Sequence, residues 1–191
     1  MRTVLLLALA ALVALPALAQ EGKDMPAGIR GEFIGQLMFA QSRILDLEQA
    51  FPQELYTWRP AEGIRSVSEV FLHIASSNYL MLKACGYPIP ADAGFDGEGE
   101  KWDTMTTDRE KIAEVIRESF DAAIAGVKTM PEEDLDRMIK MFGMEFTIRN
   151  FTVSMIAHLH EHLGQAIAYA RMNGVVPPWS AMQQQQESKE N

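Results

Sequence analysis

The side chains whose type and spacing best suit chemistry in this chain are its four histidines, His73, His158, His160 and His162. His158 and His162 are four residues apart, so in a helix they lie one turn apart on one face. Two imidazoles at this spacing can converge on one divalent ion at about 2.0–2.1 Å each. His160 is turned by about 200° from His158 and should face outward. The pair His158 and His162 is therefore a candidate metal-binding pair.

His73 lies far from this pair in sequence, on the apolar face of an earlier helical stretch. A single histidine in such a place is more often a hydrogen-bonded core residue than a ligand, whereas two buried imidazoles on one seam both need polar partners. If His73 joined the pair, three neutral imidazoles on two helices would leave coordination positions open, as in catalytic zinc sites. Spacing by itself leaves both interpretations open.

Glu161 follows His158 by three residues and lies near the edge of the same helix face. It is a candidate fourth ligand or general base. The alternative, which is more common for such a residue, is a solvated carboxylate without a functional role. The zinc-protease pattern HExxH is absent, because Gly164 stands where its second histidine would fall.

Four stretches with helical periodicity must position these residues, and no stretch alternates like a strand. We expect helices over about residues 29–49, 66–85, 107–130 and 148–172. Ser66 with Glu69, and Thr107 with Glu110, are capping-box patterns that mark two of the starts. The sequence thus predicts an all-α fold, a four-helix bundle.

The connections between these stretches differ in composition. Residues 86–106 are rich in Gly, Pro and Asp and are expected to form a long surface loop that closes a pocket with Trp102. Trp58 and Trp179 are further candidates for that closure, although ordinary packing is the commoner role of each. Residues 136–147 are expected to be a compact irregular segment.

The first residues of the chain have the pattern of an export signal. Arg2 precedes an apolar run over residues 4–15, and the small-residue pattern Ala17-Leu18-Ala19 follows it. The run is short for a transmembrane helix, so a retained anchor is the weaker alternative. We predict a signal peptide over residues 1–19, cleaved near Ala19-Gln20, and a periplasmic or secreted protein without a stable membrane anchor.

The remaining chain suits one domain over residues 25–180, followed by a low-complexity tail over 181–191 that we expect to be disordered. The chain holds 26 Asp and Glu against 17 Lys and Arg. This acidic balance argues against nucleic acid as a partner, because phosphate backbones need clustered basic residues. Cys85 is the single cysteine, so no internal disulfide can form, and we expect it to be a small buried side chain.

The chain resembles the DinB/YfiT-like family over nearly all of the mature part. The segments that carry the resemblance are LYTWRP at residues 55–60, RSVSEVFLHIA at 65–75, HLHEHLGQ at 158–165 and NGVVPPW at 173–179. The resemblance implies an up-down-down-up bundle and one divalent ion, most often zinc or nickel, held by His73, His158 and His162. It also implies frequent homodimers.

Function follows from the resemblance less directly. It implies a metal-dependent enzyme acting on a small molecule by thiol transfer or hydrolysis, with Glu161 or Gln165 orienting the nucleophile or a ligand. The predicted export weakens thiol transfer, because low-molecular-weight thiols are scarcer outside the inner membrane. Two alternatives remain open: a non-catalytic metal-binding protein of the cell envelope, and a structural bundle whose histidines only form hydrogen bonds.

Overall fold

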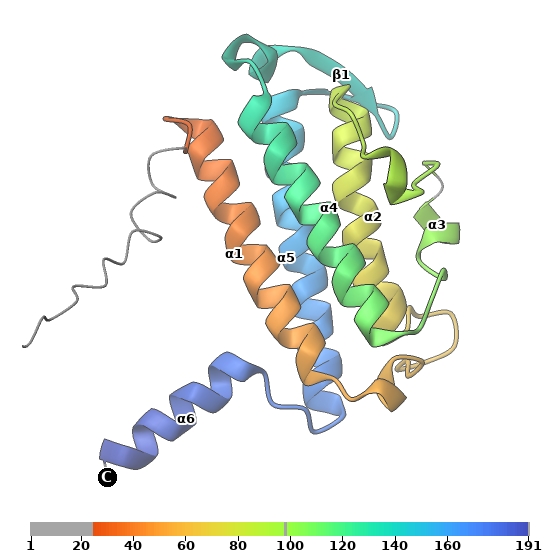
Figure 1. The fold of residues 1–191 in the computed structure, drawn as a ribbon, viewed down its shortest axis with the longest axis vertical. Helices are drawn as coiled ribbons and strands as arrows, with labels where there is room; N and C mark the ends of the chain where they lie inside the picture. Colours follow the sequence, from red (N-terminus) through yellow and green to blue (C-terminus); the bar gives the residue numbers. More distant parts are fainter. Residues whose placement is uncertain (1–24, 98, 191) are drawn as a thin grey trace, which may run out of the picture.

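The computed structural model describes residues 25–97 and 99–190, and long helices dominate this part of the chain (Figure 1). These helices are α1 (Ile29–Ala50), α2 (Val67–Cys85), α4 (Arg109–Thr129) and α5 (Ile148–Met172). In Figure 1, α1 and α5 run in one direction and α2 and α4 in the other. Both α4 and α5 pack against α1 and against α2. The predicted four-helix bundle with an up-down-down-up path is confirmed.

Shorter elements join and flank these helices. They are the 3₁₀ turns η2 (Gln53–Leu55), η3 (Ala91–Ala93) and η4 (Glu132–Asp136), the strands β1 (Met138–Met141) and β2 (Met144–Thr147), and the helices α3 (Gly99–Trp102) and α6 (Pro178–Glu190). The expected long loop after α2 therefore contains η3 and α3. None of the helices in the described residues is long and apolar enough to cross a membrane.

The apolar stripes of the helices form the core. In α1 the buried positions Phe33, Leu37, Ala40, Ile44 and Leu47 follow the bundle spacing. Burial of each large apolar side chain contributes about 1.5–3 kcal/mol, and this core therefore holds the helices in register. Cys85 is buried in the same core, as expected.

The start of α2 confirms the predicted capping box. Ser66 Oγ accepts a hydrogen bond from the Glu69 backbone N–H at 3.3 Å, and Glu69 Oε2 accepts one from the Ser66 N–H at 2.9 Å. The predicted box at Thr107 is wrong by one residue, because Asp108 caps α4 and accepts from the Lys111 N–H at 2.9 Å. The negative charge of a carboxylate at this position also stabilises the helix, because it interacts favourably with the positive end of the helix dipole.

The sequence predicted an irregular segment over residues 136–147, and this prediction is wrong. The segment includes an antiparallel hairpin of β1 and β2. The turn is formed by Phe142 and Gly143, whose φ angles are +53° and +74°. Positive φ at both central residues matches the twist of a two-residue hairpin. Each strand has four residues, which is too short for an alternating pattern to stand out in the sequence.

The C-terminal segment also differs from the sequence-based expectation, since the helix α6 (Pro178–Glu190) includes residues 181–190, which we expected to belong to a disordered tail. Pro178 suits the first turn, and the Gln, Met, Glu and Lys residues that follow are good helix formers. The helix extends away from the bundle (Figure 1). The Trp179 ring lies 4.7 Å from the Arg43 guanidinium carbon of α1. The predicted signal peptide lies outside the described residues.

Candidate metal centre

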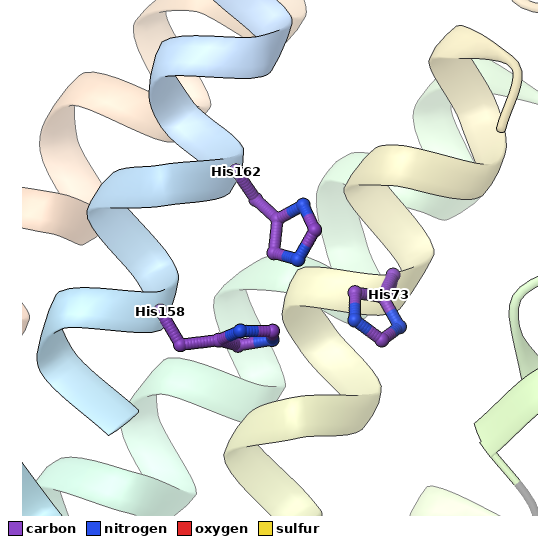
Figure 2. Close-up of side chains that lie close together, drawn as sticks. All are labelled: His73, His158 and His162. Atoms are coloured by element: carbon purple, nitrogen blue, oxygen red, sulfur yellow. The ribbon is translucent and has the colours of Figure 1, made fainter. Parts of the chain in front are cut away.

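Three histidines from two antiparallel helices converge between α2 and α5 (Figure 2). His73 comes from α2, and His158 and His162 come from successive turns of α5. Their candidate ligand nitrogens all lie within 4.8 Å of one another. The ring centroids are 5.2 Å apart for His73 and His158, 4.7 Å for His73 and His162, and 4.4 Å for His158 and His162. The structure thus brings together the three residues proposed as ligands from the sequence.

The surroundings of His158 and His162 favour the neutral form of both rings. Burial, and secondarily the positive charge that His162 and His73 would carry, lowers the pKa of His158 to about 4. Burial also lowers the pKa of His162, although its hydrogen bond to Gln165 acts in the opposite direction. At neutral pH each of these two rings therefore keeps a nitrogen lone pair, which is what a metal ion requires of histidine.

A buried carboxylate lies behind His73. Asp103 is only 4% exposed, and its Oδ2 lies 2.9 Å from Nδ1 of His73. Oδ2 also accepts from Nε of Arg65 at 3.1 Å, while Oδ1 accepts from Oγ of Ser76 at 3.1 Å. Nη2 of Arg65 lies 3.2 Å from the same Nδ1 of His73. A carboxylate behind a ligand imidazole fixes the ring orientation and its tautomer in many metal sites.

The outer nitrogen of His162 begins a second chain of hydrogen bonds. His162 Nδ1 lies 2.8 Å from Oε1 of Gln165, a pairing in which the imidazole N–H donates to the amide oxygen. Nε2 of Gln165 then donates to the Tyr169 hydroxyl at 2.9 Å, and that hydroxyl donates to the Arg65 carbonyl at 3.1 Å. Gln165 therefore holds His162 in the tautomer whose Nε2 is free.

His158 is connected differently. Its Nε2 lies 3.1 Å from Oγ of Ser77, and Ser77 Oγ donates to the His73 carbonyl at 2.7 Å. Since that hydroxyl has only one proton, its bond with His158 has the imidazole N–H as the donor. The serine therefore ties the ring of His158 to the backbone of α2.

The other residues singled out from the sequence lie outside the histidine group. Glu161 is exposed and does not join the group. His160 is half-buried and stacks on Phe39 of α1 with a centroid distance of 6.2 Å, so it faces neither the group nor open solvent. Trp102 is a core residue that packs edge-on against Tyr79 rather than a lid over the site.

Sequence reasoning missed Asp103, Arg65 and Ser77. Asp103 lies in a connection with several other acidic residues, and nothing in its spacing distinguishes it from them. Its burial and its contact with His73 arise only when α3 folds back onto α2. Ser77 offered a weak signal, because it follows His73 by four residues and shares its helix face.

The donor set fits a divalent ion of borderline softness. Neutral imidazole nitrogens suit zinc and nickel, and among the described residues no carboxylate or thiolate completes the group as a fourth protein ligand. Histidine ligands almost always donate their second N–H to an acceptor, and Asp103 and Gln165 stand in that place for His73 and His162. A group of three ligands leaves coordination positions for other molecules.

The structure is thus a helical bundle with a histidine group between its second and last long helices. Comparison with known proteins places the chain in a family. Residues 36–166 match the DinB superfamily. The chain belongs to this superfamily, which confirms the resemblance seen in its sequence.

Solved structures support the same fold. A DinB-like protein from Bacillus cereus ATCC 10987 has a TM-score of 0.67 and 20% identity, covering 78% of this chain and 95% of its own. A DinB-like protein from Bacillus subtilis has a TM-score of 0.59 and 21% identity, covering 76% of this chain and 93% of its own. At these identities the likeness concerns the fold alone. No curated protein matches the chain in sequence.

Proposed function

We propose that this chain is an exported protein that holds one divalent ion, zinc or nickel, through His73, His158 and His162, and that it acts as a metal-dependent enzyme on a small molecule. The observation that carries the proposal is the convergence of three imidazoles from two helices. Two of them have a hydrogen-bond acceptor behind the outer nitrogen, as metal-ligating histidines have. Structural histidines in a core do not require their rings to converge.

The reaction class follows from the donor set. A divalent ion bound there would lower the pKa of a thiol or a water, or polarise a carbonyl, which serves thiol transfer and hydrolysis alike. The residues of the chain supply orientation: Asp103 and Gln165 hold two of the rings. Gln165 uses both ends of its amide in that role, so it acts as a positioning residue and not as a base. Glu161, the base suggested by the sequence, has an exposed carboxylate outside the histidine group, so that role rests on the sequence alone.

A non-catalytic metal-binding protein of the cell envelope is the second candidate. The polar groups bonded to the three rings are Asp103, Arg65, Ser77 and Gln165, and each of them is already engaged with a ring nitrogen, so none is a ready base. This favours binding without catalysis. A screen of thiol transfer and of ester and amide hydrolysis separates the two: an activity that is lost on chelation and restored by zinc or nickel supports the enzyme.

Metal content tests the ligand assignment. Elemental analysis of the untagged mature protein should give close to one divalent ion per chain, since one group of three imidazoles is present in the described residues. His162→Ala should lose that ion, whereas His160→Ala, on the same helix but stacked against Phe39, should keep it. Full retention of the ion by His162→Ala would overturn the assignment.

Export and self-association belong to the same proposal. The pattern of residues 1–19 supports export to the periplasm or medium. N-terminal sequencing of the protein from a cell-envelope fraction should start near Gln20, and a cytoplasmic protein that starts at Met1 would contradict export. A homodimer is suggested by the family resemblance, and light scattering of the purified protein measures it directly.

A further inference from the structure

The outer nitrogen of His73 has two polar neighbours that one tautomer cannot satisfy together. Nδ1 lies 2.9 Å from Oδ2 of Asp103 and 3.2 Å from Nη2 of Arg65. The Asp103 carboxylate only accepts and needs a proton on Nδ1, whereas the Arg65 guanidinium only donates and needs a lone pair there. The tautomer of His73 therefore decides which neighbour it bonds.

An ion on this ring selects between the two. A ligand nitrogen offers its lone pair, so when Nε2 of His73 faces the centre of the group, the ring proton is on Nδ1. That tautomer donates to Asp103, and Arg65 keeps its own bond from Nε to the same carboxylate at 3.1 Å. With no ion present, both tautomers are available, and Arg65 competes with Asp103 for Nδ1.

Asp103 belongs to the connection between α2 and α4, not to either ligand helix. It directly follows α3, and the preceding Trp102 packs edge-on against Tyr79 of α2 and against Phe95. Both oxygens of the Asp103 carboxylate bond to α2 or to the residue before its cap, through Ser76, His73 and Arg65. The carboxylate that orients a ligand is therefore also a main polar attachment of this connection to the bundle.

We propose that Asp103 is the positioning residue of His73, and that through it the connection of residues 86–108 is coupled to occupancy of the metal site. The inference rests on the proposed function. Asp103 favours the tautomer that can bind an ion, so it raises the affinity of the site. Coupling is reciprocal, so a bound ion strengthens the bond to Asp103 and holds the connection against α2.

Hydrogen exchange of the native mature protein tests the coupling without any substitution. Zinc should slow amide exchange in residues 99–105 by about tenfold relative to the chelated protein, a change within the usual range of coupling between sites. The hairpin of residues 138–147, which lies outside the histidine group, is the internal control and should not respond. Equal exchange of residues 99–105 with and without zinc would overturn the proposal.

Substitution of the carboxylate tests its role as a positioning residue. Asp103→Asn keeps the size but removes the charge, so zinc affinity should fall about 10–100-fold, and the exchange of residues 99–105 should no longer respond to zinc. The absorption spectrum of the cobalt(II) protein should shift as well, because it reports ligand geometry and not stability. Asp92→Asn, an exposed acid of the same connection, is the matched control and should change neither.

The outcomes separate this inference from the proposed function. If the native protein binds neither zinc nor nickel, the proposed function fails and the coupling fails with it. If the native protein binds zinc and Asp103→Asn binds it equally tightly, with an unchanged cobalt spectrum, only the role of Asp103 is wrong. A poorly folded Asp103→Asn, seen by circular dichroism, leaves the decision to the exchange of the native protein.

Discussion

Two polar clusters inside the bundle, the histidine group and the pair Glu48 and Tyr56, differ in what their neighbours leave free. In the histidine group, neighbours occupy the outer nitrogens of His73 and His162, and the inner nitrogens converge. In the second cluster, between α1 and η2, the Glu48 carboxyl and the Tyr56 hydroxyl are paired with each other. The Tyr56 hydroxyl also bonds the Glu48 carbonyl at 3.1 Å. The first cluster brings ring nitrogens together in a shared space, whereas in the second the Glu48 and Tyr56 side chains bond each other.

The charge states of the two clusters follow from burial in opposite ways. Burial lowers the pKa of His158 and raises the pKa of Glu48, so both groups are driven toward their neutral forms. A neutral Glu48 can donate to the Tyr56 hydroxyl, which then donates to the Glu48 carbonyl, leaving Oε2 without a partner among the described residues. A neutral imidazole has a nitrogen lone pair that can bind a metal ion. A neutral carboxyl has lost the negative charge that would attract one. Burial therefore favours the metal-binding form of His158 and His162, whereas it disfavours the charged form of Glu48 that would bind a cation.

The largest expected difference between the clusters is in their response to zinc. An ion that binds only the folded state stabilises it by about 4 kcal/mol at a free concentration a thousandfold above Kd, which raises Tm by roughly 10 °C. His158→Ala should abolish this rise because one of the three proposed ligands is gone. Glu48→Gln should keep it, since that side chain lies outside the histidine group. Thermal unfolding with and without zinc measures both, and a rise that persists in His158→Ala would contradict the comparison.

A smaller effect is expected from Tyr56→Phe. Loss of the hydroxyl leaves the buried Glu48 carboxyl without its partner, which costs about 1–3 kcal/mol of unfolding free energy. Zinc affinity should stay unchanged, because the pair shares no hydrogen bond with the histidines. Urea unfolding and a zinc titration of the same variant check the two statements. A variant as stable as the native protein would show that the pair contributes nothing.

In the metal-free protein, the two clusters should change the free energy of unfolding with pH in opposite directions. His158 has a pKa of about 4 when folded against 6.5 as the ordinary value. The unfolded chain therefore binds the extra proton, and stability falls by on the order of 2 kcal/mol as the pH drops through this window. Glu48 has a raised pKa, so its contribution is present below 4.5 and is lost as the pH rises through the folded value.

Urea unfolding from pH 4 to 8 measures these two slopes. His158→Gln should remove part of the loss on the acid side, and Glu48→Gln should remove part of the loss toward neutral pH. The same pH profile in His158→Gln as in the native protein would mean that His158 is not the group responsible.

Local patterns determined much of the fold and part of the candidate site. Apolar spacing along α1 and α5 needs only helix geometry, so the helices and the one-turn separation of His158 and His162 follow from the sequence. The family resemblance added His73. The hairpin turn at Phe142 and Gly143 and the helix α6 escaped this reasoning, because short strands and low-complexity segments carry weak periodic signals.

Tertiary structure alone decided how His73 and His158 are held, whereas Gln165 holds His162 from the same helix face. Asp103 and Arg65 reach His73 from the connection after α2 and from the residue before its cap. Asp103 and His73 are 30 residues apart, and the chain between them turns back on itself. Their contact therefore cannot be predicted from the spacing of residues in the sequence. Which buried acid bonds a histidine and which pairs with a tyrosine depends on the packing of α3 against α2 and on the contact of Tyr56 with α1. Helix periodicity places side chains on a face, and only packing chooses their neighbours.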